Sequence, residues 1–217
     1  MDALSPNAMI HIAAGVIALM IGLVPLLSAK GGRAHRRFGH VAIGLGAIVL
    51  VTALIGVVFD DAPMALAAVT LSAGYQYVGS LRALALRDHG PGWIDALLAC
   101  LAVVLAAWML IQAKPGSDSW PPALAYGTLG YLATVVIYDV SRHAWPRLWL
   151  RRIRPLDHGL KMTGFYFAMA SAGAGNLLRD WQPWSQLLPS SIGLVVILIF
   201  AILFFRRQAR ALPVASA

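Results

Sequence analysis

Long apolar stretches, separated by short polar connections, dominate the hydrophobic pattern of the chain. The connections are rich in Pro, Gly and Asp, which are residues that end helices. A helix of about 20 apolar residues spans the ~30 Å hydrocarbon core of a bilayer. The pattern therefore predicts seven transmembrane helices, at about residues 7–28, 40–59, 64–86, 92–113, 121–142, 157–178 and 188–206.

The same stretches argue against a membrane β-barrel. Barrel strands alternate apolar and polar residues with a period of two, and this alternation is absent here. Backbone groups in lipid have to be bonded within their own segment, which a helix achieves. We therefore predict an all-α, polytopic bundle that forms a single domain over residues 1–217. The first helix is expected to be retained, because the preceding sequence MDALSP carries an acid and no cation, unlike a signal peptide.

Composition supports this class. Charged residues make up 12% of the 217 residues and hydrophobic residues 59%, whereas soluble domains carry about a quarter charged residues. Cys100 is the only cysteine and lies inside an apolar stretch, so the sequence holds no disulfide framework. The chain also lacks G-x-S-x-G, a Walker-type glycine loop, H-E-x-x-H and a Cys pair. Hydrolase, nucleotide-binding and zinc-protease activities therefore have no motif here, and enzymatic activity stays open.

The distribution of cations predicts the orientation. If seven helices alternate in direction, fifteen of the 17 Lys and Arg residues fall on one side, and only Lys114 and Arg179 fall on the other. Cytoplasmic loops carry the excess of Lys and Arg. The N-terminus is therefore expected outside and the C-terminus in the cytoplasm, in a multi-pass protein of the cell inner membrane. Tryptophans are expected at the interfaces, with Trp120, Trp181 and Trp184 outside and Trp93, Trp145 and Trp149 inside.

The net charge of +8 follows mostly from this topology. We expect the basic loops to meet anionic lipid headgroups on the cytoplasmic side, and other membrane subunits are a second class of partner. No nucleic-acid partner is expected, because the cations are spread over several short loops without a recognisable nucleic-acid module.

Polar residues gather at the predicted cytoplasmic face. The stretch AKGGRAHRRFGH, residues 29–40, enters the second helix and contains four cations and two histidines. An ionisable side chain inside a membrane is costly unless it is paired. Asp139 and Arg142 lie three residues apart on one helix face, so we expect Asp139 to pair with Arg142 or with Arg36. The candidate members of the polar cluster are His35, Arg36, His40, Tyr77, Arg82, Asp139, Arg142 and His158.

Simpler interpretations apply to several of these charges. Arg and Lys at helix ends extend to the headgroups as a rule, and Asp95 and Asp157 are favourable charges if they begin helices. If the stretch 29–40 is only a basic anchor, its cations are interchangeable. If Arg36 docks on Asp139 while His35 or His40 faces His158, they are not, because only Arg offers a planar fork of donors.

His11 is the one histidine expected in the outer leaflet. It begins the series His11, Gly15, Ala18 and Gly22 at helical spacing, which predicts a close helix contact. A stripe of Gly164, Ala168 and Ala172 on the sixth helix is a candidate complementary surface. The imidazole is expected to bond either to a neighbouring backbone group or to Asn176 at similar depth, and ligand and proton-carrier roles are the alternatives.

Several motifs occur in an order that resembles a group of bacterial multi-helix membrane proteins grouped as a domain of unknown function. The motifs are His11-x-x-x-Gly15, Ala18-Leu19, Gly22, Lys30-Gly31, His35-Arg36-x-x-Gly39, Tyr77-x-Gly79-x-x-Arg82, Asp139-x-x-Arg142, His158-x-x-x-Met162 and Ala170-Ser171. The resemblance covers about residues 9–175 and leaves the last helix unmatched. That group tends to have Trp-Arg-Met after its late histidine, where this chain has Gly159-Leu160-Lys161-Met162. The resemblance implies a multi-helix membrane protein and no particular reaction.

Three functions fit these observations. We favour an accessory or assembly role in a membrane complex, in which the polar cluster fixes helix packing. The first alternative is a redox protein that binds b-type haem or a quinone near the cytoplasmic face, since imidazoles from two helices can clamp haem iron. The candidate haem ligands are His40, His143 and His158, together with His35.

The second alternative is a small proton-coupled transporter or channel. In that case Asp139, Arg142, Arg36 and His158 form a gated polar site near the cytoplasm, and His11 lies at the outer mouth. Hydrolysis inside the membrane by a metal ion with scattered His and Asp ligands is the least favoured reading.

Overall fold

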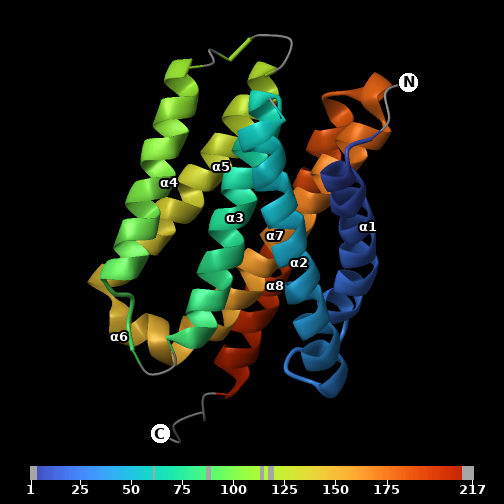
Figure 1. Ribbon diagram of the computed structural model, residues 1–217. Helices are drawn as coiled ribbons and strands as arrows, with labels where there is room; N and C mark the ends of the chain where they lie inside the picture. Colours follow the sequence, from blue (N-terminus) through green and yellow to red (C-terminus); the bar gives the residue numbers. More distant parts are fainter. Residues whose placement is uncertain (1–3, 61, 87–88, 113–114, 117–119, 212–217) are drawn as a thin grey trace, which may run out of the picture.

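The computed structural model describes residues 4–60, 62–86, 89–112, 115–116 and 120–211, and Lys114 lies outside these ranges. This part of the chain is all-helical (Figure 1). The long helices are α1 (Pro6–Leu27), α2 (Arg33–Phe59), α3 (Met64–Ala85), α4 (Trp93–Gln112), α5 (Pro122–Ser141), α7 (Arg154–Leu177) and α8 (Trp184–Ala211). Short helical turns are η1 (Arg142–Ala144), α6 (Pro146–Leu148), η2 (Trp149–Ile153) and η3 (Arg179–Trp181).

Each of the seven predicted stretches contains a long helix, so the all-α prediction is confirmed. The largest difference concerns α2, which begins at Arg33 and not at residue 40. Residues 33–39 are mostly polar and basic, so the pattern of apolar stretches does not indicate that they are helical. Nothing in that segment prevents a helix, because Gly39 is tolerated inside a helix at a cost of about 1 kcal/mol.

Among the residues that the structure describes, five helices are long and apolar enough to cross a membrane, which indicates a membrane protein. They are α1, α2, α4, α5 with its η1 extension, and α8. The helices α3 and α7 are of similar length but carry polar side chains on buried faces, such as Gln76 on α3 and Lys161 on α7. A helix in the interior of a bundle can hold polar groups because neighbouring helices, and not lipid, surround them.

The helix α3 lies at the centre of the bundle (Figure 1). It packs along α7 and also contacts α2, α4 and α5, while α1 pairs with α2, and α8 pairs with α7. The helices α1 and α8 begin at the same end of the bundle, and α8 ends at the opposite end (Figure 1). Because α1 contacts mainly α2, and α8 contacts mainly α7, each of these two peripheral helices keeps a broad face away from the protein core.

Two tryptophans expected at the membrane interfaces are buried instead. Trp120 and Trp149 have no exposed surface. Trp120 packs in a core cluster with Ala68 and Met109. Trp149 lies in the turn after α5 and bonds to a buried carboxylate of α7. These two residues are therefore not available to contact headgroups, whereas Trp93 and Trp181 are exposed.

A glycine sets the distance between α2 and its neighbours. A Cβ added at Gly46 would lie 2.8 Å from Phe165 Cε1 and 3.2 Å from Tyr77 Cε2. These two rings lie against each other with centroids 5.1 Å apart, and the Tyr77 hydroxyl donates to the Ile43 carbonyl at 2.8 Å. The three helices α2, α3 and α7 therefore meet where only glycine fits.

Replacing Gly46 tests this contact. We expect Gly46→Ala to lower the free energy of unfolding by about 1–3 kcal/mol, because Phe165 is buried and has no room to move away. Gly44→Ala is the matched control on the same helix, since a Cβ there meets no atom within 4 Å. Thermal unfolding in detergent measures both variants. Equal melting temperatures for the two variants would contradict close packing at Gly46.

Candidate functional site: a buried charge quartet

Four charged side chains form the most buried polar cluster in the described part of the chain. Asp139 and Arg142 lie at the end of α5, while Asp157 and Lys161 lie in the first turns of α7. The turn over residues 142–153 reverses the chain between these helices and brings the two pairs face to face. We call Asp139, Arg142, Asp157 and Lys161 the charge quartet.

Each cation of the quartet contacts both carboxylates. Arg142 Nη2 lies 3.1 Å from Asp139 Oδ1, and Arg142 Nη1 lies 2.9 Å from Asp157 Oδ2. Lys161 Nζ lies 2.7 Å from Asp139 Oδ1 and 2.9 Å from Asp157 Oδ1. At most 5% of any of these side chains is exposed. Two positive and two negative charges thus form a closed ring with no net charge.

Neighbouring aromatic residues complete the quartet. The Tyr75 hydroxyl donates to Asp139 Oδ2 at 2.8 Å, and Trp149 Nε1 donates to Asp157 Oδ2 at 3.0 Å. The Arg142 guanidinium also lies 4.9 Å from the centre of the Trp149 ring. Because all four carboxylate oxygens accept bonds and both cations are shared, the desolvated charges are well compensated. The arrangement suits a cluster that fixes the positions of helices better than a cluster that exchanges protons or solutes.

A second ion pair joins α3 to α4 at the same end of the bundle. Arg82 Nε and Nη2 donate to Asp95 Oδ1 and Oδ2 at 3.2 and 2.8 Å, in a bidentate geometry that is stronger than a single contact. Asp95 Oδ2 also accepts the backbone N–H of Gly92 at 2.9 Å. Asp95 therefore combines the predicted role at a helix N-terminus with an ion pair that the sequence analysis did not assign.

Only part of the predicted cluster comes together. The pair between Asp139 and Arg142 is present, but the alternative pair with Arg36 is wrong, because Arg36 is exposed near the start of α2 while α3, α5 and α7 enclose the Asp139 carboxylate. His40 is also exposed and bonds through Nδ1 to the Arg36 carbonyl at 2.7 Å. Asp157 and Lys161 are the two quartet members that the predicted cluster lacks. They lie four residues apart, which places both on one helix face, and this spacing was the available signal.

His35 and His158 line one cavity of ≈ 100 Å³ between α1, α2, α7 and α8. His35 Nδ1 donates to the Pro25 carbonyl at 3.0 Å, and His158 Nδ1 lies 2.7 Å from Ser80 Oγ. Lys30 lines the same cavity with its Nζ 4.5 Å from the centre of the Phe200 ring, and burial lowers the pKa of Lys30. The expectation that His35 or His40 faces the region of His158 therefore holds for His35.

Two of the four candidate haem ligands, His35 and His158, line this cavity, while His40 and His143 are exposed. This cavity has a volume of ≈ 100 Å³, whereas pockets for cofactors and drug-sized ligands enclose roughly 300–1,000 Å³. Across the described ranges there is also no group of three or more His, Cys, Asp or Glu residues placed to hold a metal ion.

His11 has a structural partner other than Asn176. Its Nδ1 lies 2.9 Å from Thr52 Oγ1 and 3.2 Å from the Val49 carbonyl, both on α2. Asn176 is exposed and donates to the Ala172 carbonyl of its own helix. Of the two expected partners, Asn176 is therefore wrong, and the backbone group is present as the Val49 carbonyl. The apolar pattern gives the depth of each residue but not its direction around the helix, and His11 points toward α2.

The small-residue stripes also meet different partners. A Cβ at Gly22 would lie 3.1 Å from the Tyr166 ring, so α1 does approach α7 at that point. Gly164, however, packs against Gln76 of α3 and the Tyr131 hydroxyl of α5. The predicted match between the two stripes is therefore replaced by a contact of α7 with α3.

No protein-family model, no curated protein and no solved structure matches this chain. The resemblance to a group of bacterial membrane proteins therefore stands on the ordered motifs alone.

A double-mutant cycle tests whether the quartet acts as a unit. We expect Asp139→Asn to destabilise the protein by about 3–5 kcal/mol, because it leaves a cation buried without its full share of negative charge. Adding Lys161→Gln should recover part of this loss, so the two changes are not additive. Thermal unfolding in detergent provides the measurement.

Arg36→Ala is the control for this cycle. Because Arg36 is exposed, we expect it to leave the melting temperature unchanged and to add independently to Asp139→Asn. Additive effects of Asp139→Asn and Lys161→Gln would contradict the closed ring.

Proposed function

We propose that the chain is a multi-pass protein of the cell inner membrane, with seven transmembrane helices, an external N-terminus and a cytoplasmic C-terminus. Seven helices of 20–28 residues support this arrangement, because about 20 residues span the bilayer core. The helices α3 and α7 are included because their polar groups face other helices. Cations gather where α1 ends and α2 begins, as expected for the cytoplasmic side.

We further propose that it serves as an accessory or assembly subunit of a membrane complex. The observation that carries this proposal is the saturation of the quartet, since each carboxylate already accepts from two cations and one aromatic donor. Such a cluster fixes α5 and α7 in place and holds no spare ionisable group for chemistry. The basic loops would meet anionic headgroups, and nucleic acid is not a proposed partner.

The peripheral helices offer surfaces for such a complex. The helix α8 packs mainly on α7 and keeps apolar side chains such as Leu198 and Ile202 half exposed or more. The helix α4 similarly exposes Val104 and Ile111. Apolar faces of this kind contact lipid or the helices of another subunit.

A small proton-coupled transporter is the second candidate. It is favoured by a cavity of ≈ 130 Å³ between α3, α4 and α5, which reaches Asp95, Asp139 and Arg142. A solute in this cavity would lie beside the edge of the quartet. The saturation of the quartet argues against a transporter, because an ionisable group that couples transport to protons has to release its partner during transport.

Reporter fusions test the topology. A reporter that is active only outside the cytoplasm should be silent when fused after Ala217 and active when fused after Pro63. We expect this result because α8 ends, and α2 and α3 are joined, at opposite ends of the bundle. Activity after Ala217 together with silence after Pro63 would reverse the orientation.

A complementation experiment separates the two candidate functions. In cells that lack the protein, an assembly role predicts the loss of one membrane complex on native gels. The variant Asp139→Asn/Lys161→Gln removes one opposite pair and keeps the remaining pair of Arg142 with Asp157. If it folds, an assembly subunit should still restore the complex to within about twofold, because a neutral substitution of a buried ion pair is often tolerated.

Arg36→Ala serves as the control and should restore the complex fully. Restoration by Arg36→Ala but not by the folded double variant would favour a chemical role for the quartet, as in the transporter. An unchanged set of membrane complexes in cells without the protein would reject the assembly role.

A further inference from the structure

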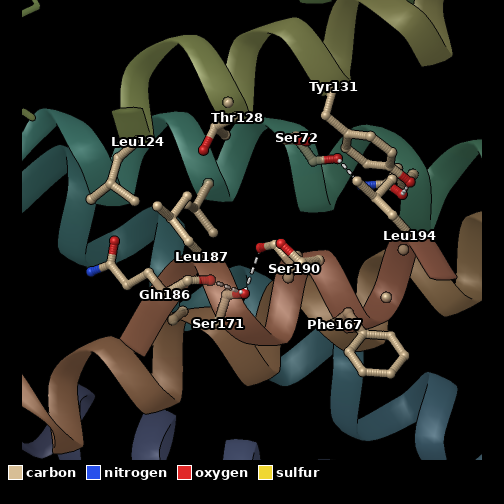
Figure 2. A pocket seen from close by; sticks show the side chains of 18 of the residues that line it. Ser72, Leu124, Thr128, Tyr131, Phe167, Ser171, Gln186, Leu187, Ser190 and Leu194 are labelled. Carbon is tan, nitrogen blue, oxygen red and sulfur yellow. Dashed lines mark hydrogen bonds between the residues drawn. The ribbon is translucent and has the colours of Figure 1, made fainter. Parts of the chain in front are cut away.

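A cavity of ≈ 210 Å³ lies between α3, α5, α7 and α8, apart from the charge quartet. Figure 2 shows its polar lining, which includes Ser72, Thr128, Tyr131, Ser171, Gln186 and Ser190. Gln76 lies 12 residues after Met64, the first residue of α3, which corresponds to about 18 Å at 1.5 Å per residue. The cavity thus extends from the end of the bundle where α3 begins to about the middle of the bundle.

Hydrogen bonds hold the inner wall of this cavity in place. The Tyr131 hydroxyl donates to Gln76 Oε1 at 2.9 Å, and Gln76 Nε2 donates to the Ser72 carbonyl at 3.2 Å. Gly164 lets α7 approach this amide, because a Cβ there would collide with Gln76 Oε1. An amide has two donor hydrogens and two acceptor lone pairs. These two bonds therefore leave Gln76 one donor and one acceptor position for another molecule.

Hydroxyl groups line the outer part of the cavity from two sides. Ser171 Oγ donates to the Gln186 carbonyl at 2.8 Å and lies 2.7 Å from Ser190 Oγ. From the opposite side, the Thr128 side chain of α5 points into the cavity (Figure 2). A molecule in the cavity could therefore exchange hydrogen bonds at two depths, with Gln76 and Tyr131 inside and with the hydroxyls outside.

The cavity is open toward the lipid and carries no charge. Its lining residues include no Asp, Glu, Lys, Arg or His. The exposed residues Gly127 of α5 and Leu194 of α8 line it, and α5 and α8 do not pack closely against each other. Most of the remaining lining is apolar, including Phe167 and Leu187. A ligand would reach the cavity sideways from the bilayer, between α5 and α8.

We propose that this cavity binds an uncharged lipid with carbonyl or hydroxyl groups on its head and an apolar tail. Diacylglycerols and isoprenoid quinones share this chemistry. The head would bond to Gln76, Tyr131 and Thr128, and the tail would leave between α5 and α8. A charged headgroup is disfavoured because nothing in the cavity neutralises it. The proposal rests on the membrane-spanning arrangement proposed above, but not on its orientation or on the assembly role.

Native mass spectrometry of the purified protein in a neutral detergent tests this proposal. The probes are dioleoylglycerol, decylubiquinone and, as the charged comparison, dioleoylphosphatidylglycerol. We expect at least one neutral probe to bind about tenfold more tightly than the phosphatidylglycerol, which corresponds to ~1.4 kcal/mol. The preference between the two neutral probes identifies which source of this chemistry the cavity takes.

Two glycines of α5 provide a matched pair of variants. A Cβ at Gly127 or Gly130 meets no atom within 4 Å, but only Gly127 lines the cavity. Gly127→Leu should block the mouth and weaken binding about tenfold or more, while Gly130→Leu should stay within about twofold of the wild type. Equal binding by the two variants, or no preference for a neutral probe over phosphatidylglycerol, would overturn the proposal.

Polar substitutions keep the test valid if Gly127→Leu fails to fold. Thr128→Val and Tyr131→Phe preserve shape and each remove one hydroxyl, so each should weaken neutral-lipid binding by about fivefold, the value of one hydrogen bond of ~1 kcal/mol. Wild-type affinity in both variants would show that water or detergent fills the cavity and would reject the proposal. A reversed topology in the fusion experiment, or an unchanged set of membrane complexes, would not alter these binding results. The lipid proposal can therefore fail while the proposals on topology and assembly hold, and the reverse is also true.

Discussion

Four buried charges that neutralise one another join the end of α5 to the start of α7. Any one of these charges alone would be costly in an apolar environment, because an unpaired buried ion loses its hydration without compensation. The turn over residues 142–153 removes this cost by placing the end of α5 against the start of α7. Arg142 then contacts both Asp139 and Asp157, so the position of each helix depends on the other.

The sequence predicts those parts of the fold that depend on long apolar stretches. The seven helices and the proximity of Asp139 to Arg142 follow from helix length and from a spacing of three residues. The expected position of His35 and His158 near the same end of the bundle agrees with the cavity that both of them line.

Helix length and residue spacing do not predict toward which neighbouring helix a given side chain points. Arg36 and Lys161 are cations at similar expected depth, yet only Lys161 reaches Asp139. The choice depends on which face of each helix meets its neighbour, and the weak amphipathic pattern of a membrane helix does not fix this face. His11 bonds to Thr52 and not to Asn176 for the same reason. The sequence places Trp149 in a short connection, and in the structure this connection is a helical turn in which the indole N–H donates to Asp157.

The charge quartet and the neutral cavity both include residues of α5 and α7. These two helices are not among the pairs that pack closely along their lengths, so they are joined mainly through side chains. At one end the long side chains of Arg142 and Lys161 reach carboxylates of the other helix. Farther along α5, Tyr131 reaches across to Gln76 of α3, and beyond that bond the space stays open toward α8. Charges thus join the two helices at one end, and uncharged hydrogen-bonding groups line the separate cavity that we propose to hold a neutral lipid.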